Sequence, residues 1–335
     1  MRPLAAVLLA TGAILAALAL GAAFGETAIP LGIVAKTAAN HLFGAGFAVN
    51  PIDAGIVWDY RLARAVVAAC CGVALALSGV VLQALLRNAL ADPYVLGISA
   101  GASTGAVTVA ILGVGAGALS LSAGAFLGAL MAFGIVALLA RAAGSGAGAV
   151  ILAGIAGSQL FNALTSFIVT RSANAEQARG IMFWLLGNLS GARWTDVALT
   201  LPVAATGALV CLLQVRALDA FTFGADSAAS LGVPVRATQI LLVSTAALMT
   251  AVMVSIVGSI GFVGLVIPHA ARFLVGARHW RLVPVSAVMG AVFLVACDIA
   301  SRVIVPGQVV PIGVVTALIG APIFALILIR ARRLT

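Results

Sequence analysis

The chain has 335 residues, of which 63% are hydrophobic and only 8% are charged. This composition is typical of a polytopic helical membrane protein, and no polar block is long enough to form a soluble domain. Hydrophobic and polar residues do not alternate with period two over strand-length segments, which excludes a membrane β-barrel. The basic residues punctuate apolar runs and do not gather with aromatic residues, so the net charge of +9 reflects membrane topology rather than nucleic-acid binding.

Apolar runs long enough to cross a bilayer recur from one end of the chain to the other. The run at 65–86 holds 22 residues without a charge, which at about 1.5 Å per residue crosses a hydrocarbon core about 30 Å thick. In chain order, the runs lie near residues 4–24, 65–86, 95–112, 119–140, 149–169, 197–215, 283–304 and 309–329.

One further stretch, between Arg236 and Arg272, has 35 uncharged residues and is interrupted by glycines and Pro268. It forms either one span with a re-entrant tail or two spans. Two spans place eleven basic residues on the cytoplasmic side against seven outside, whereas one span gives six against twelve. Because cytoplasmic loops are enriched in Lys and Arg, we predict an all-α protein with about ten transmembrane helices, a single membrane domain over 1–335 and both termini in the cytoplasm.

Two other features have simple interpretations. The first 24 residues resemble a secretory signal in having Arg2 before an apolar run, but the run of some 20 residues exceeds the usual signal core, so a first span is preferred. The four cysteines lie inside predicted spans without a C-x-x-C pair, which indicates buried packing residues rather than disulfides or a metal site.

Five segments of the sequence resemble FecCD-type permeases, the membrane subunits of ABC importers for iron-siderophore, heme or cobalamin uptake. The segments are RLARAVVAACCGVALALSGVVLQALLRNALADPYVLGISAGAS at 61–103, FWLLGNLSGARW at 183–194, LDAFTFGADSAASLGVPV at 218–235, GSIGFVGLVIPHAARFLVG at 258–276 and VVPIGVVTALIGAPIFALIL at 309–328. Ala63 and Ala89 stand where the family usually has prolines, which leaves the local geometry of the second span open.

The resemblance implies a type II ABC importer permease fold in the bacterial inner membrane. It also implies a homodimer of permeases, two ATPase subunits and a periplasmic substrate-binding protein. The sequence contains no P-loop, and its only lysine is Lys36, so ATP and Mg²⁺ are expected on the partner ATPase and no cofactor is expected in this chain. No cluster of a nucleophile, an acid or metal ligands suggests an enzyme.

A cytoplasmic connection is predicted at 216–236, with Gly224 separating two short helices and Gly232 ending the second. The resemblance implies that this segment docks on the ATPase, although an ordinary interfacial loop is the alternative. The expected coupling residues are Leu218, Ala220, Gly224, Asp226, Ala228, Leu231 and Gly232.

On the opposite face, Arg61, Arg64 and Arg302 are expected to form an exposed positive surface near the periplasmic connection at 170–196. The resemblance implies that these arginines meet acidic residues of the binding protein, and lipid head-group anchoring is the alternative. Asp298 lies four residues before Arg302, and an ion pair between these two residues is a further alternative.

The fifth span carries polar residues on roughly one helical face, and we expect this face to line the translocation pathway or to bond neighbouring helices. These residues are Ser158, Gln159, Asn162, Thr165 and Ser166. The preceding connection, with Gly144, Ser145 and Gly146, is expected to be mobile and to serve as a gate.

No histidine is predicted at mid-membrane depth: His41 falls in an outer loop, while His269 and His279 fall at the inner end. We therefore expect passage by shape through a weakly interacting pathway, and the sequence does not distinguish heme, a ferric siderophore and cobalamin. The alternative function is an ion-coupled secondary transporter. That mechanism usually needs a carboxylate within the membrane, and Asp298 is the only acidic residue within a predicted span.

Overall fold

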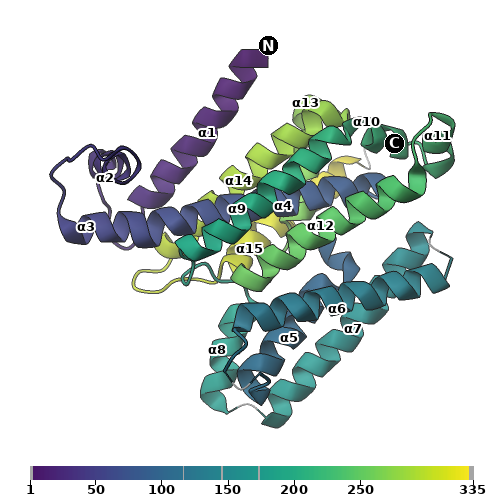
Figure 1. Cartoon of the computed structure of the whole chain (residues 1–335), viewed down its shortest axis with the longest axis horizontal. Helices are drawn as coiled ribbons and strands as arrows, with labels where there is room; N and C mark the ends of the chain where they lie inside the picture. Colours follow the sequence, from purple (N-terminus) through teal and green to yellow (C-terminus); the bar gives the residue numbers. More distant parts are fainter. Residues whose placement is uncertain (1–2, 116, 145, 173, 332–335) are drawn as a thin grey trace.

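The computed structural model describes residues 3–115, 117–144, 146–172 and 174–331. Throughout these ranges the regular secondary structure is helical (Figure 1). The α-helices are α1 (Pro3–Ala23), α2 (Leu31–Phe43), α3 (Pro51–Gly55), α4 (Ala63–Leu85), α5 (Ile98–Leu112), α6 (Leu121–Ala142), α7 (Ala147–Ser172), α8 (Ala175–Leu185), α9 (Trp194–Leu213), α10 (Val215–Phe221), α11 (Ala225–Ser230), α12 (Val235–Val257), α13 (Val263–Val275), α14 (His279–Val303) and α15 (Ile312–Ala331). A π-helical segment, η1 (Ile56–Leu62), joins α3 to α4, and a short 3-10 helix, η2 (Pro93–Leu96), precedes α5.

Seven of the described helices are long and apolar enough to cross a membrane: α1, the continuous α3–η1–α4 rod, α6, α7, α9, α12 and α14. Three shorter apolar helices, α5, α13 and α15, complete the set. The prediction of an all-helical polytopic protein with about ten helical segments is therefore confirmed.

The ambiguous stretch between Arg236 and Arg272 forms two helices, α12 and α13, separated at Gly258–Phe262. Arg272 near the end of α13 donates a hydrogen bond of 2.6 Å to Gln83 near the end of α4, so α13 returns the chain to that end of the bundle. With 13 residues, α13 is only about 20 Å long, which is shorter than a full crossing.

Helix α4 is the central element, and 89% of its apolar window is buried inside the chain. Two glycines allow neighbouring backbones to approach it: Gly72 faces Gly290 of α14, and Gly79 faces Gly264 of α13. A side chain at either glycine would overlap backbone atoms, which is the packing that small residues permit between membrane helices. Ala63 donates its backbone N–H to the Tyr60 carbonyl, so α4 continues without a break into η1, and a proline there would lack this donor.

The helices form two groups (Figure 1). Helices α5, α6, α7 and α8 lie together on one side, and close contacts of Gly101 with Gly128 and of Gly105 with Gly124 join α5 to α6. Helices α1, α9, α12, α13 and α14 pack on α4, and α15 packs on α13 and α14. Helices α2 and α3 lie at one end of the bundle and α10 and α11 at the other, so the two predicted functional surfaces are at opposite ends.

The two groups pack together through α12, which contacts α5 and α6, and hydrogen bonds also join them where helices are interrupted. Ser99 in the first turn of α5 donates a hydrogen bond of 2.9 Å to Ser259, and the Tyr94 hydroxyl both donates to the Ile260 carbonyl (2.9 Å) and accepts from the Ile260 N–H (2.8 Å). Phe262, which caps α13, has a φ of 70°, an uncommon value for a residue with a large side chain. Irregular backbone inside a membrane protein needs such internal partners, because lipid offers none.

Candidate functional site

The connection at 216–236, which we call the inner-end segment, folds as predicted from its glycines. Helices α10 and α11 are separated at Gly224, and Gly232 follows the end of α11 with a φ of 81°. Gly224 has a φ of 108° and a ψ of 165°, a conformation that residues with a side chain rarely adopt. A Cβ atom at Gly224 would lie 3.2 Å from the guanidinium of exposed Arg87, which can move aside, so glycine is needed here for its conformation.

The expected coupling residues have two different environments. Leu218, Ala220 and Ala228 are buried within the chain, and Gly224 is buried as well, so these residues hold the segment on the helical bundle. Asp226, Leu231 and Gly232 are exposed. Phe223, which no sequence feature marked, is 76% exposed beside Gly224 and forms, with Leu231, the apolar part of the exposed surface of this segment.

Two contacts connect the inner-end segment to neighbouring elements, and one of them is a set of polar interactions. The Asp219 carboxylate on α10 accepts hydrogen bonds from the backbone N–H of His279 (2.9 Å) and lies 2.7 Å from its Nδ1 atom. The Arg87 guanidinium lies against Gly224. Of the residues in these two contacts, only Gly224 belongs to the expected coupling set. The sequence gives no signal for either contact, because the partners are far apart along the chain.

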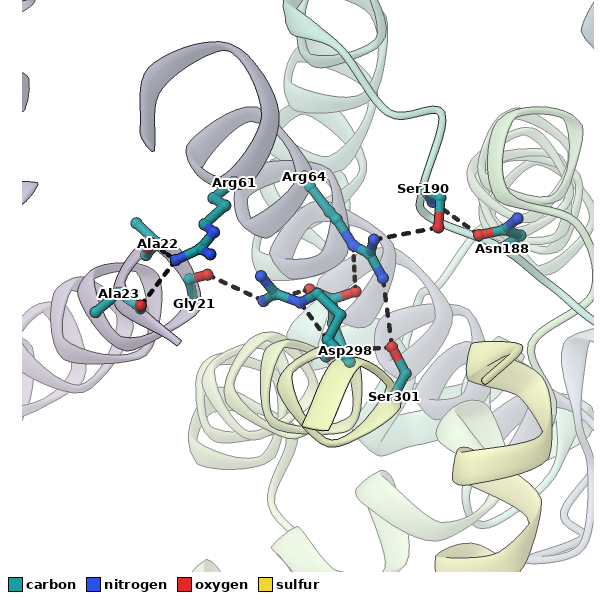
Figure 2. Close-up of polar contacts among 10 residues, drawn as sticks. Gly21, Ala22, Ala23, Arg61, Arg64, Asn188, Ser190, Asp298 and Ser301 are labelled. Atoms are coloured by element: carbon teal, nitrogen blue, oxygen red, sulfur yellow. Dashed lines mark hydrogen bonds and ion pairs between the residues drawn. The ribbon is translucent and has the colours of Figure 1, made fainter. Parts of the chain in front are cut away.

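At the outer end, the expectation of an exposed arginine surface is wrong. Arg61, Arg64 and Arg302 are only 7–8% exposed, and the guanidinium groups of Arg61 and Arg64 are directed into the protein (Figure 2). The reason is Asp298, a fully buried carboxylate on α14. Its Oδ1 atom accepts a hydrogen bond of 2.6 Å from Arg64 Nε, and its Oδ2 atom lies 2.9 Å from Arg302 Nη2.

The remaining donors of these arginines have partners of their own. Arg64 donates to the hydroxyls of Ser190 (3.2 Å) and Ser301 (3.3 Å), and Arg302 donates to the carbonyl of Gly21 (2.9 Å). We call Arg64, Asp298 and Arg302 the outer ion cluster. It joins α4, α14, the end of α1 and the segment before α9, so its clearest role is to fix these elements relative to one another.

Arg61 does not contact the carboxylate of Asp298. It donates to the carbonyl groups of Ala23 (2.9 Å) and Thr27 (2.6 Å), which follow or end α1. The last carbonyl groups of a helix have no partner within the helix, and a cation there is favourable. Arg61 therefore closes the C-terminal end of α1.

The exposed positive charge at the outer end comes from other residues. Arg193 is exposed, and its guanidinium lies 5.7 Å from the centre of the Tyr60 ring. Beneath it, Trp194 donates from Nε1 to the Trp58 carbonyl (3.0 Å), and the Trp58 ring stacks on His41 with 4.2 Å between ring centres. Arg193 lies within the predicted periplasmic connection at 170–196, but nothing in its spacing marked it as a functional residue.

The polar residues of α7 do not all share one face. Thr165 is buried, and its hydroxyl lies 2.8 Å from that of Thr104 on α5, so this residue bonds two helices of the same chain. Ser158 is partly buried. Gln159, Asn162 and Ser166 are exposed and recur at intervals of three and four residues, which places them on one exposed stripe of the helix.

The glycines in the connection before α7 are not packed against other parts of the described chain. Gly144 has a φ of 104°, and a Cβ atom at Gly144 or Gly146 would meet no atom within 4 Å. Ser145 lies outside the described residues.

A comparison with known protein families shows to which family the chain belongs. A model of the FecCD transport family matches residues 11–330. The chain belongs to the FecCD transport family. This FecCD permease is 42% identical over 280 residues to the cobalamin import system permease protein BtuC of Halobacterium salinarum, an alignment that covers 82% of this chain and 73% of the relative. It is 35% identical over 277 residues to the Fe(3+) dicitrate transport system permease protein FecD of Escherichia coli, covering 83% and 86% of the two chains.

A solved structure agrees with this assignment. An inward-facing metal-chelate type ABC transporter superposes with a TM-score of 0.82 at 28% identity, over 96% of this chain and 97% of the other. The FecCD permease is thus the multi-pass membrane component of an ABC importer, and its partners are an ATPase and a binding protein.

The FecCD permease also has a cavity that the sequence did not reveal, at the end of the bundle where α9 begins. It has a volume of about 540 Å³, is lined by α8, the start of α9 and the neighbouring ends of α5 and α6, and includes Gln177, Trp184, Asn188 and Asp196. Helix α8 is positioned by a capping box between Asn174 and Gln177. Within the described ranges, no group of three or more His, Cys, Asp or Glu side chains is arranged to hold a metal ion.

Proposed function

We propose that two copies of this permease form a translocation pathway between them in the bacterial inner membrane, with both termini in the cytoplasm. Two ATPase subunits, which bind ATP and Mg²⁺, drive the cycle, and a periplasmic binding protein delivers an iron chelate, such as heme or a ferric siderophore, or cobalamin. Membership of the FecCD family and the named substrates of BtuC and FecD support this chemistry. In this proposal residues 1–335 form one permease domain.

The observation that carries the homodimer is the exposed polar stripe on α7. Gln159, Asn162 and Ser166 extend over about two turns of a helix that is long and apolar enough to cross the membrane. Polar side chains directed at lipid are costly, so this stripe needs a partner surface or a water-filled pathway. A second copy facing it supplies both, because two polar stripes then enclose a path lined by neutral amides and hydroxyls.

Further features agree with the gate and the coupling segment. The open glycine connection at Gly144 and Gly146 precedes α7, so movement there would change the inner end of the pathway. The segment 216–236 lies at the same end of α4 as Arg87 and Arg272, and its exposed surface of Phe223, Asp226 and Leu231 is our proposed contact with the ATPase.

For the binding protein, we propose an indirect role of the three buried arginines. They fix the end of α1 and the segment around Ser190, while exposed Arg193 provides the positive charge that meets acidic residues. Opposite charges on a wet rim mainly increase the rate and orientation of docking, which suits a partner that must leave after delivery.

A secondary transporter driven by protons or sodium is the alternative function. Such a mechanism needs a carboxylate that can exchange its counter-ion within the membrane. Asp298 is instead enclosed by Arg64 and Arg302, a role that accounts for the carboxylate without ion coupling. Uptake of radiolabelled cobalamin or ferric dicitrate into proteoliposomes with the matched ATPase and binding protein discriminates the two: uptake that persists without ATP would contradict the proposal.

Cysteine cross-linking tests the pathway directly. The four native cysteines are buried, so Asn162→Cys supplies an accessible thiol on the α7 stripe. We expect oxidation to join two copies of this variant in membranes. Leu138→Cys is the matched control, because Leu138 is 69% exposed on α6, outside the stripe. Equal cross-linking of both variants, or none at 162, would refute the proposed interface.

A further inference from the structure

The first turn of α14 is capped by a residue from another element. The first backbone N–H groups of a helix have no partner within it, and the residue before α14, Arg278, makes no capping hydrogen bond with its side chain. Asp219 supplies the acceptor from α10, 60 residues earlier in the chain. A carboxylate at a helix N-terminus is favourable both as a hydrogen-bond acceptor and as a negative charge.

The contact is directional and partly buried. The same Asp219 oxygen that accepts the His279 backbone N–H lies 2.7 Å from His279 Nδ1, and since the carboxylate can only accept, Nδ1 is the donor. The His279 side chain is 1% exposed, whereas that of Asp219 is 41% exposed. Asp219 therefore connects the exposed surface of the inner-end segment to the buried His279 side chain at the start of α14.

The apolar contacts of α10 do not duplicate this bond. Leu218 and Phe221 are buried beneath the segment, but apolar contacts are non-directional and allow one surface to shift over another. Two hydrogen bonds to a helix N-terminus instead define both position and direction. The two interactions of Asp219 with His279 therefore link a movement of the inner-end segment to the first turn of α14.

Helix α14 connects the two ends of the protein. Its 25 residues extend about 37 Å, and its last turns carry Asp298 and Arg302 of the outer ion cluster. Pro284 interrupts the backbone hydrogen bonding of α14 near its start, and beyond it Gly290 packs closely on the Gly72 backbone of α4, which holds the rest of the helix in place. One continuous helix therefore links His279 to the outer ion cluster.

We propose that Asp219 is a positioning residue that couples the inner-end segment to the outer surface through α14. Docking of the ATPase on residues 216–236 shifts α10, Asp219 carries the first turn of α14 along, and Asp298 and Arg302 move relative to α1 and to Ser190. This inference rests on the proposed function, because it needs the segment to be the ATPase contact.

Hydrogen exchange measured by mass spectrometry on the assembled importer tests this chain of contacts, with Mg²⁺ and a non-hydrolysable ATP analogue as the probe. In the wild type, we expect the analogue to change exchange in peptides covering 215–230 and also 298–305. In Asp219→Ala, we expect the analogue still to change exchange at 215–230. Its effect on exchange at 298–305 should fall by about tenfold, the change expected for loss of a hydrogen bond to a charged group. Asp219→Asn keeps an oxygen acceptor for both donors, so it should retain most of the effect at 298–305.

The outcomes distinguish failure of the proposed ATPase contact from failure of the proposed role of Asp219. If 215–230 does not respond in the wild type, the assignment of this segment as the ATPase contact fails. If 215–230 responds but 298–305 responds equally in Asp219→Ala, or does not respond in the wild type, the role of Asp219 fails. His279→Ala removes the side-chain donor alone and should give an intermediate loss, which keeps the test valid if Asp219→Ala does not assemble.

Discussion

Replacement of Asp298 by alanine is the sharpest test of the outer ion cluster. Asp298 is fully buried and has Arg64 Nε at 2.6 Å and Arg302 Nη2 at 2.9 Å. The substitution leaves two guanidinium groups, each less than a tenth exposed, without a counter-ion. Both retain neutral acceptors, Arg64 at Ser190 and Ser301 and Arg302 at Gly21, but these do not neutralise the charge.

The expected loss follows from the burial of the cluster. Removing one partner of a buried ion pair costs about 3–5 kcal/mol in the free energy of unfolding, because the remaining charge stays desolvated. At about 1.4 kcal/mol per factor of ten, this lowers the folding equilibrium constant by roughly 100- to 4,000-fold. Asp298→Asn, which keeps the shape and one acceptor oxygen, should lose less than Asp298→Ala.

The assay is unfolding of the purified permease in mixed micelles by titration with sodium dodecyl sulfate, followed by intrinsic tryptophan fluorescence. A triple variant, Arg64→Met with Asp298→Leu and Arg302→Met, provides the control, because replacing a whole buried ionic group by apolar residues is often neutral. We expect this variant to regain most of the stability lost in Asp298→Ala. A loss below about 1 kcal/mol in Asp298→Ala, the value of an exposed pair, would refute the cluster as described.

Three other changes test separate contacts. Gly72→Leu should lower the free energy of unfolding by about 3 kcal/mol or more, because its side chain overlaps the Gly290 backbone, whereas Gly134→Leu, with open space around its Cβ position, should change little in the same titration. Thr165→Val should cost about 0.6–1 kcal/mol by removing one hydrogen bond to Thr104, and an unchanged titration midpoint would contradict that bond. Gly224→Leu should strain the backbone by about 1–3 kcal/mol and lower ATP-dependent uptake in proteoliposomes, and wild-type uptake would show that this junction does not contribute to coupling.

The fold followed from the sequence where local composition determines it. Each apolar run gave a helix, the charge distribution favoured two helices between Arg236 and Arg272, and the glycines marked the break between α10 and α11. The shortness of α13 was not predictable from hydropathy. It depends on the irregular backbone at Gly258–Phe262 having partners such as Tyr94, and those partners come from a distant part of the chain.

The candidate sites were harder to predict because their environments are made by long-range contacts. Arg64 resembles an exposed residue when its sequence neighbours alone are considered, and Asp298, which makes it a buried one, lies 234 residues away. The same limit applies to α7: spacing grouped Thr165 with Gln159 and Asn162, and only the position of Thr104 on α5 separates it from them. Residues were therefore assigned to the correct end of the protein more reliably than to its surface or interior.

The central position of α4 has a consequence for how the protein is made. The helix enters the membrane early during synthesis, yet Gly72 packs on Gly290, a residue that emerges more than 200 positions later. Arg64 must likewise stay without its carboxylate partner until α14 has been inserted. Until α14 has been made, these two positions of α4 therefore lack their native partners, and the central contacts of the fold form last.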